Sequence, residues 1–172
     1  MLFRSIRAGI ESVRGVPGRF ELVDEGQSFS VVVDYAHKPA SLERVLQAAR
    51  ALGDGRLICV FGCGGDRDRG KRPLMGRIAS ELADVAIVTS DNPRSEDPLA
   101  IIEEIAAGAP HLDVEPDRRA AIARAIESAR EGDVVLIAGK GHEQGQEIAG
   151  TVYPFDDRDV ARELLRALLQ PA

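Results

Sequence analysis

The sequence predicts an α/β fold, a Rossmann-like, doubly wound and mostly parallel sheet with helices on both faces. Two observations support this fold class. Apolar runs of strand length alternate with amphipathic stretches of helical period along the 172 residues. Three of the runs, VVVD, LICVF and VVLIA, are almost uninterrupted, as in strands covered on both faces. Repeated strand–helix units are the pattern that builds an open parallel sheet.

The expected elements follow in order along the chain. Five strands are expected, at Ser30–Asp34, Leu57–Phe61, Val85–Thr89, Leu112–Glu115 and Val134–Ala138. Five helices are expected, at Ala40–Leu52, Arg72–Leu82, Pro98–Ala107, Arg118–Arg130 and Arg158–Leu169. Each helix has a recurring apolar face. Pro73 and Pro98 suit the first turns of their helices.

The amino-terminal stretch departs from this repeat. Leu2–Val13 is expected to be a short helix, and Phe20–Val23 is a candidate strand. Between them Val16–Arg19 contains a Pro-Gly pair that breaks regular structure. We therefore expect a boundary near residues 14–18, with residues 1–15 as a lead-in and residues 16–172 as one α/β domain.

Composition narrows the class of protein. Apolar residues make up 44% and charged residues 29% of the chain, and the net charge is −6, so no overall basic surface for nucleic acid is expected. No apolar run approaches the roughly 20 residues of a membrane span, and the first residues do not resemble a signal peptide. Cys59 and Cys63 form a lone C-x3-C, which is a poor metal pattern, so both are expected to be reduced thiols in a cytoplasmic protein.

Unusual residues collect in four loops, each directly after an apolar strand. These loops are Asp34–Pro39, Gly62–Lys71, Asp91–Arg94 and Gly139–Glu143. Because the carboxyl ends of parallel strands share one edge, where ligands bind in open α/β sheets, the four loops together predict a ligand site. The competing interpretation for any single loop is a solvated turn.

The glycine-rich loop is not a phosphate loop, although Gly65–Lys71 fits G-x4-G-K between a strand and a helix. Arg72 stands where a phosphate loop needs the Ser or Thr that holds magnesium. The loop instead offers the guanidinium groups of Arg67 and Arg69, which can grip a carboxylate with paired hydrogen bonds.

The loop Asp91-Asn92-Pro93-Arg94 combines an acceptor, an amide and a guanidinium around a rigid proline. Such a set can bind both ends of a zwitterionic amino acid, with Asp for the ammonium and Arg for the carboxylate. Spacing alone favours an alternative, an Asn-Pro turn followed by a helix cap at Ser95 or Asp97.

The loop Gly139–Glu143 follows a buried strand. Gly139 lets the backbone approach a ligand, and Glu143 can accept an ammonium group. His142 is either a general base or a structural residue, and His111 is expected to be an exposed bystander. No spacing supports a metal site built from the three histidines His37, His111 and His142, and none is expected.

These motifs resemble the carboxyl-terminal domain of the Mur ligases, in the form that uses meso-2,6-diaminopimelate. The resemblance covers residues 16 to about 169. It rests on VPGRFE (16–21), VDYAHKP (33–39), FGCGGDRD (61–68), GKRPLMG (70–76), DNPR (91–94), GKGHE (139–143) and FDDR (155–158).

The resemblance implies a function in peptidoglycan biosynthesis, and so in cell-wall formation, cell shape and cell division. In the family, ATP with Mg²⁺ phosphorylates the D-glutamate carboxylate of UDP-N-acetylmuramoyl-L-alanyl-D-glutamate, and the amine of diaminopimelate attacks the acyl phosphate. A central domain with a true phosphate loop handles ATP and most of the Mg²⁺ site. Residues 1–15 resemble the tail of that domain, so this chain is expected to be inactive without the central and amino-terminal domains.

The site residues are carried over motif by motif. The amino-acid site would comprise Arg67, Asp91, Asn92, Pro93, Arg94, Gly139 and Glu143. The nucleotide contacts would be Arg19 and Asp34, with His37 in the same loop. The resemblance assigns Asp91, Asn92 and Arg94 to the choice of diaminopimelate over lysine, which lacks the distal carboxylate.

The sequence leaves two alternatives to the ligase domain that the resemblance implies. The first is a stand-alone module that binds a diamino acid or a nucleotide. The second is a kinase-like enzyme that uses the glycine-rich loop, and Arg72 counts against it.

Overall fold

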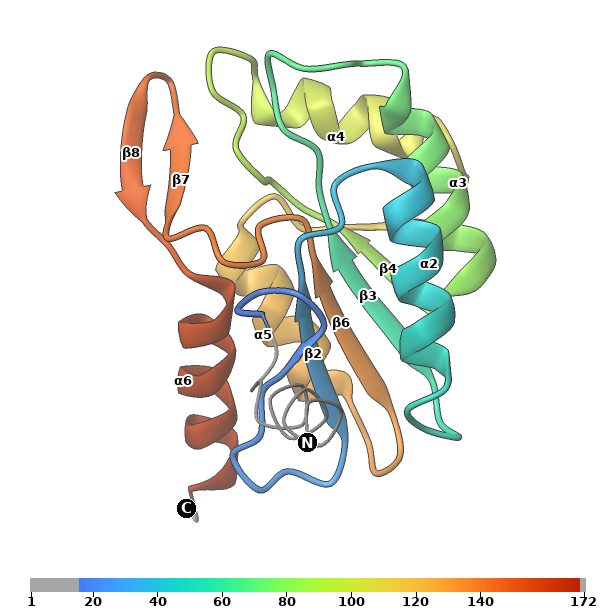
Figure 1. Cartoon of the computed structure of the whole chain (residues 1–172). Coiled ribbons are helices and arrows are strands. Elements are labelled where there is room, and N and C mark those ends of the chain that lie inside the picture. Colours follow the sequence, from blue (N-terminus) through green and yellow to red (C-terminus); the bar gives the residue numbers. More distant parts are fainter. Residues whose placement is uncertain (1–15, 171–172) are drawn as a thin grey trace, which may run out of the picture.

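A computed structural model describes residues 16–170 of the chain. Within this range the main sheet has six strands in the order β1-β2-β6-β3-β4-β5 (Figure 1). They are β1 (Glu21–Leu22), β2 (Ser30–Asp34), β3 (Leu57–Phe61), β4 (Val85–Val88), β5 (Asp113–Val114) and β6 (Val134–Ala138). Strands β2 to β6 pair in parallel, whereas β1 joins the β2 edge antiparallel. The carboxyl ends of the parallel strands therefore meet at one edge.

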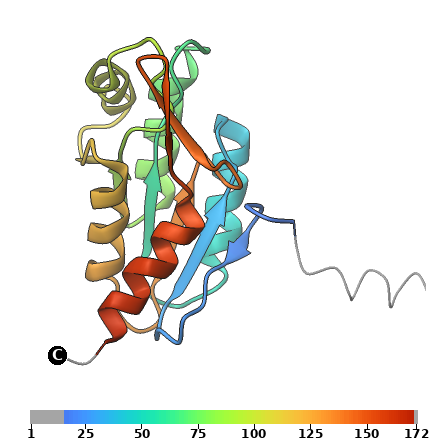
Figure 2. The ribbon, with the colours of Figure 1, turned by 90° about the vertical axis from the view of Figure 1, so that its left-hand side faces the viewer.

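Helices cover both faces of the sheet, which confirms the doubly wound prediction (Figures 1 and 2). They are α2 (Pro39–Arg50), α3 (Lys71–Leu82), α4 (Pro98–Ala106), α5 (Arg118–Ser128) and α6 (Asp157–Leu169). Helices α2, α3 and α4 share one apolar cluster with the sheet, and α5 and α6 share the other. Strands β7 (Gly145–Ile148) and β8 (Thr151–Pro154) form a separate antiparallel hairpin.

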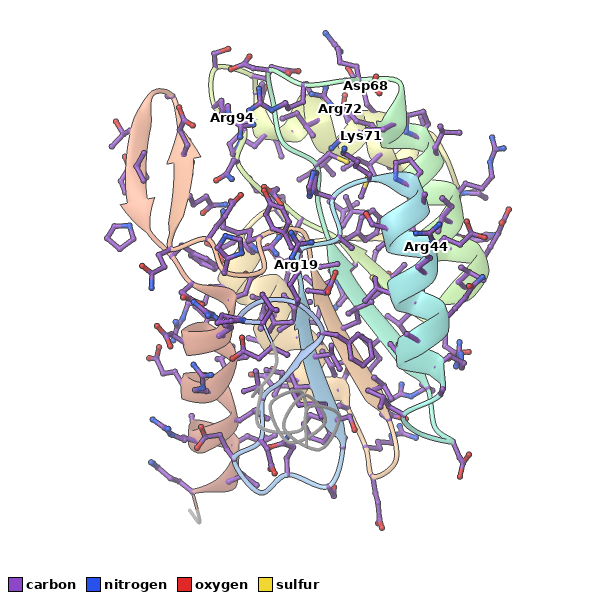
Figure 3. All side chains as sticks on the ribbon, in the orientation of Figure 1. Arg19, Arg44, Asp68, Lys71, Arg72 and Arg94 are labelled. Atoms are coloured by element: carbon purple, nitrogen blue, oxygen red, sulfur yellow. The ribbon has the colours of Figure 1, made fainter. Side chains whose placement is uncertain are left out.

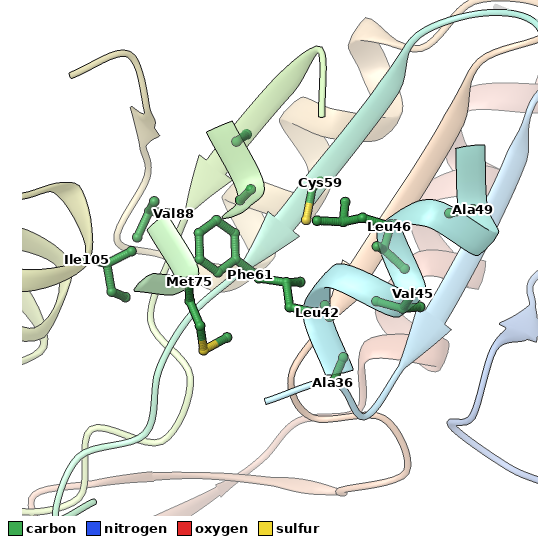
Figure 4. Close-up of a cluster of buried hydrophobic side chains, with 14 of the residues drawn as sticks. Ala36, Leu42, Val45, Leu46, Ala49, Cys59, Phe61, Met75, Val88 and Ile105 are labelled. Carbon is green, nitrogen blue, oxygen red and sulfur yellow. The ribbon is translucent and has the colours of Figure 1, made fainter. Parts of the chain in front are cut away.

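The two apolar clusters follow from the alternation of side chains along each strand. In β2, Val32 faces the α2 side while Val31 and Val33 face α5 and α6. On the α2 side, Phe61 and Met75 lie at the centre of the cluster, fully buried (Figure 4). Burying a side chain of this size contributes about 1.5–3 kcal/mol, so the uninterrupted apolar runs are a direct consequence of two covered faces.

Aspartate side chains begin three of the helices. Asp97, Asp117 and Asp156 each precede a first turn and accept a hydrogen bond from a backbone N–H within it. Asp97 is thus the cap that the sequence predicts for α4, while the Ser95 hydroxyl donates instead to Asp66, at 2.6 Å. Such caps satisfy backbone donors that have no partner inside the helix.

Most predicted elements are confirmed, and the differences lie at their ends. Strands β2, β3 and β6 have the predicted bounds, while β5 is shortened to two residues. Helices α2 and α5 end at Arg50 and Ser128, two residues before their expected ends. The candidate strand at Phe20–Val23 exists as β1, outside the parallel repeat, as expected. The predicted helix at Leu2–Val13 lies outside the described residues, and the hairpin β7–β8 was not predicted.

One ion pair is entirely buried between the α5–α6 layer and the sheet. The guanidinium of Arg118 meets the carboxylate of Asp157 through two bonds, at 2.8 and 2.7 Å, and neither side chain is exposed. Arg118 also donates to the carbonyl oxygens of Ser90 and Ala138, at 3.3 and 3.2 Å. This pair explains the second aspartate of the FDDR motif: Asp157 neutralises an arginine that ties the ends of β4 and β6 to α6.

Replacing Arg118 with methionine should destabilise the chain by about 3–5 kcal/mol, because it leaves Asp157 as a buried, unpaired charge. Urea unfolding followed by circular dichroism would measure the loss. Arg119→Met is the matched control, since it breaks the neighbouring α5–α6 pair with Glu163, which is exposed on both sides. The control should have a much smaller effect. Equal losses in the two variants would contradict a special role for the buried pair.

Both cysteines are free and buried in the α2-side cluster. Burial raises the pKa of Cys59 and of Cys63 to about 12. Because only the thiolate reacts, a thiol-specific reagent at pH 8 should label neither cysteine in the folded chain, and both in 6 M urea, where they regain an ordinary pKa of about 8.5. Absorbance with a disulfide reagent would count the labelled groups. Rapid labelling of one group without denaturant would show that its burial is incomplete.

Candidate functional site

The four loops predicted from the sequence do converge. They line one cavity of about 530 Å³ at the carboxyl edge of the parallel strands. Loop residues after β2, β3, β4 and β6 all contribute side chains to its wall. Figure 3 shows Arg94, Lys71 and Asp68 at this end of the sheet. The predicted residues that line the cavity are His37, Arg67, Asp91, Asn92, Arg94, Gly139 and Glu143.

The loop after β4 carries the densest group of polar side chains. Asp91 and Asn92 are only 7% exposed, so both side chains lie largely within the protein. Arg94 adopts a left-handed backbone conformation, with φ of 53°. Its guanidinium donates to the carbonyl of Gly65 at 2.7 Å and lies 3.4 Å from the carboxylate of Glu147. The remaining nitrogen atom, Nη2, is available to a ligand carboxylate in the cavity.

The unpredicted hairpin β7–β8 holds this loop in place. Arg94 N–H donates to the carbonyl of Glu147 at 3.0 Å, and Ala149 N–H donates back to the carbonyl of Arg94 at 2.7 Å. Gln146 donates its side-chain amide to the carbonyl of Asp91 at 2.9 Å. A non-glycine residue in a left-handed conformation is strained, and these bonds from the hairpin maintain it.

Gly139 is required where β6 ends. Its φ is +122°, and a methyl group at its Cβ position would come within 2.5 Å of the Asp91 carboxylate. Glycine therefore allows the β6 and β4 loops to touch. Four residues further along the chain, the Glu143 carboxylate accepts a hydrogen bond from the Asn92 side-chain amide at 2.8 Å. The carboxylates of Asp91 and Glu143 thus line the same cavity as Arg94 and Arg67.

The two arginines of the glycine-rich loop have different partners. Arg67 is exposed and lines the cavity, and within residues 16–170 its one hydrogen bond is a long contact with a neighbouring carbonyl, so it is available to a ligand. Arg69 points away and pairs with Glu104 of α4. The expectation that both would grip a ligand carboxylate was therefore wrong for Arg69.

Arg72 has a structural role that explains why the loop is not a phosphate loop. Its fully buried guanidinium pairs with Glu96 and Glu104, both at 2.8 Å. This pairing lowers the pKa of Glu96 to about 2. The position that a hydroxyl would occupy in a phosphate loop is used to join α3 to α4.

The residues predicted to contact a nucleotide form a second group beside the cavity. The Arg19 guanidinium stacks on the Tyr35 ring, 4.6 Å from its centre, and the His37 ring lies 4.6 Å from the same ring. The Asp34 carboxylate accepts a hydrogen bond from the Phe20 N–H at 2.8 Å, which places Arg19 next to it. Arg19 and Asp34 do not line the cavity. Tyr35 links the two groups, and the sequence interpretation missed it because its motif was read for charged residues.

Other predicted residues lie outside the cavity wall. Pro93 is buried and packs against Gly65, so it shapes the loop rather than facing the cavity. His142 is exposed, with its ring 5.3 Å from that of Tyr35. His111 is exposed, as expected. A second hollow of about 400 Å³ lies at the amino-terminal ends of β2 and β6, but its Asp133 carboxylate is already bound to Arg56.

Residues 16–170 present neither a metal-binding cluster nor a membrane-spanning helix. No group of three or more His, Cys, Asp or Glu side chains in this range is arranged to hold a metal ion. No helix in the same range is both long and apolar enough to cross a bilayer.

The fold and this cavity define the chain as an α/β domain with a charged cavity at the carboxyl edge of a parallel sheet. The family model described as "Mur ligase, glutamate ligase domain" matches residues 18–141. The chain therefore belongs to the Mur ligase family.

Relatives of known name agree with this assignment. The chain is 60% identical, over 94% of its length, to a UDP-N-acetylmuramoyl-L-alanyl-D-glutamate--2,6-diaminopimelate ligase of Syntrophomonas wolfei, of which it covers 34%. It is 54% identical to the ligase of that name from Streptomyces coelicolor, over 95% of this chain and 34% of the relative. The chain thus spans about a third of the length of these relatives.

Solved structures extend the comparison. A structure of a UDP-N-acetylmuramoyl-L-alanyl-D-glutamate--2,6-diaminopimelate ligase superposes with a TM-score of 0.85 at 41% identity, over 99% of this chain and 37% of that one. A folylpolyglutamate synthase/dihydrofolate synthase from Yersinia pestis, complexed with AMPPNP and Mn ion, superposes with a TM-score of 0.65 at 19% identity, over 95% of this chain and 34% of that one. The second likeness shows a shared fold.

Proposed function

We propose that this chain is the amino-acid-binding domain of a ligase that adds meso-2,6-diaminopimelate to UDP-N-acetylmuramoyl-L-alanyl-D-glutamate. One observation carries the proposal. The guanidinium groups of Arg67 and Arg94 and the carboxylates of Asp91 and Glu143 line a single cavity. Diaminopimelate has two carboxylates and two ammonium groups, so it can satisfy all four. A cavity of about 530 Å³ is within the usual size range for a small ligand.

The proposed domain comprises residues 16–172, with residues 1–15 as the tail of a preceding central domain. In this proposal the described residues bind and orient the amino acid, so that its amine can attack an acyl phosphate formed with ATP. Relatives with the name of this ligase support the assignment. The whole reaction, in the cytoplasm, would require the part of the longer relatives that this chain does not span.

This chain provides only part of the proposed nucleotide site. The Arg19 and Asp34 side chains and the Tyr35 and His37 rings together suit the edge of an adenine nucleotide, with a cation, an acceptor and two ring faces. Residues 16–170 provide no cluster of acidic or histidine side chains for Mg²⁺. ATP would supply the phosphoryl group that activates the acceptor carboxylate, and we propose that its phosphates and Mg²⁺ are held mainly outside this chain.

A stand-alone binding module remains the alternative, because the same cavity would serve it. The two functions differ in their dependence on the nucleotide. Calorimetry of the chain with meso-diaminopimelate, in the presence and absence of ATP, addresses both. Binding of diaminopimelate supports the amino-acid site, and its absence at millimolar ligand would contradict the proposal. Binding of ATP alone would favour a nucleotide module.

Arg94→Ala should weaken binding of meso-diaminopimelate by about 1–3 kcal/mol, roughly a factor of 5 to 150, because the distal carboxylate loses its charged partner. Lysine lacks that carboxylate, so its weaker binding should change little. Calorimetric titration of both amino acids into both forms of the chain would measure the two effects. Lysine binding as tight as that of diaminopimelate, and unaffected by the substitution, would rule out the proposed selectivity.

Arg67→Ala should weaken capture of the amino acid more than Lys71→Ala does. Both side chains line the cavity, but the Lys71 ammonium already donates to the carbonyl of His37 at 2.7 Å. Arg67 has only one long contact and a planar group that suits a carboxylate. The ratio of the two dissociation constants for diaminopimelate tests this difference. Equal losses would mean that the glycine-rich loop contributes only positive charge.

A further inference from the structure

Lys140 is a charged residue of the site that faces the protein rather than the cavity. It is one of three lysines in the chain, and its side chain has no exposed area. Its ammonium donates to the Asn92 side-chain oxygen at 2.9 Å and lies 3.4 Å from Oε2 of Glu143. Lys140 therefore contacts the side chains of two proposed ligand-binding residues while being absent from the cavity wall.

Lys140 determines which way the Asn92 amide points. The Asn92 oxygen accepts from Lys140 Nζ and from the backbone N–H of Glu147, the latter at 3.0 Å. An ammonium group and a backbone N–H can only donate, so the amide oxygen must face them. The Asn92 nitrogen is thereby directed at Oε2 of Glu143, 2.8 Å away. Reversing the amide would place donors against donors.

The same contacts orient the Glu143 carboxylate. Its Oε2 atom receives the Asn92 amide and the Lys140 ammonium. Neither of these bonds uses its Oε1 atom, and Glu143 lines the cavity near the Tyr35 hydroxyl, so a ligand in the cavity can reach this carboxylate. Charged hydrogen bonds of this kind are strong where water is excluded.

We propose that Lys140 is a positioning residue that fixes the Asn92 amide and turns one oxygen of Glu143 toward an ammonium group of the ligand. This role rests on the proposed function, because it assumes an amino-acid ligand. The charged groups around Lys140 influence its protonation in opposite directions. Burial lowers the pKa of Lys140, and the Asp91, Glu143 and Asp157 carboxylates oppose this shift, whereas Arg118 adds to it.

A first experiment needs no ligand. In the folded chain the side-chain NH₂ group of Asn92 should give two well-separated NMR signals with slow hydrogen exchange, because its orientation is fixed. In Lys140→Met the amide loses one of two fixed donors, so exchange should accelerate by about tenfold or more. Lys140→Gln, which is neutral but polar, should also accelerate the hydrogen exchange of the Asn92 amide. This variant replaces Lys140→Met in the test if the methionine variant does not fold. Arg77→Met, which removes an exposed charge of α3, is the control and should leave the signals unchanged.

A second experiment asks whether the ammonium group is recognised. 2-Aminopimelate keeps both carboxylates of diaminopimelate and lacks one ammonium. The original chain should bind diaminopimelate about tenfold or more tightly than 2-aminopimelate, as expected for one charged hydrogen bond. In both Lys140 variants this ratio should fall toward one, whereas general destabilisation would weaken the two ligands equally.

The outcomes separate this inference from the proposed function. Unchanged Asn92 signals in both Lys140 variants would overturn the positioning role, whatever the ligands do. An unchanged ligand ratio would overturn the link to ammonium recognition. If the original chain bound neither ligand while the Asn92 signals changed as expected, the proposed function and ammonium recognition would both fail, and Lys140 would be shown to position Asn92 alone.

Discussion

The Arg118 guanidinium is the contact on which the rest of the site depends. It lies behind the cavity, fully buried, and binds the Asp157 carboxylate together with the last carbonyl groups of two strand ends. Those strand ends lead into the loop of Asp91 and the loop of Gly139. Because a guanidinium is planar and has donors on three sides, one side chain can set the separation of both loops. The cavity wall is therefore supported from inside the domain by a charge that never meets the ligand.

The charged side chains of the site fall into two sets, one buried and paired within the protein and one lining the cavity. Arg118, Arg72 and Lys140 are buried and paired with carboxylates or polar groups of the protein. Arg67 and Arg94 reach the cavity and keep donors free. A buried charge needs a partner within the protein because its desolvation is costly. A charge at a cavity wall stays hydrated until a ligand supplies the opposite charge. Replacement of the buried arginines would mainly destabilise the domain, whereas replacement of the cavity arginines, or of the positioning residue Lys140, would mainly alter binding.

Much of this organisation could be predicted from the sequence, for identifiable reasons. The runs VVVD, LICVF and VVLIA marked strands covered on two faces, and each one ended in an unusual loop, so the edge that carries the site followed from strand direction. The hairpin β7–β8 could not be predicted in this way, because neither of its short strands contains an apolar run. The sequence gives no reason to assign different roles to Arg67 and Arg69. Their roles differ because Glu104 on α4 pairs with Arg69. The role of Lys140 depends on its contact with Asn92, 48 positions away, which no local pattern encodes.

The left-handed conformation of Arg94 has a consequence for how the domain tolerates change in length. Its backbone N–H is bonded to Glu147 of β7 and its carbonyl to Ala149 in the turn that follows, so the hairpin is attached to this loop at two points. One residue added or removed within β7 would reverse the faces of the strand and move Glu147 away from Arg94. Beyond Ala149 the strand β8 is exposed along its length and carries no such contact. Strand β8 can thus vary in sequence, whereas the length of β7 is constrained by its contacts with Arg94.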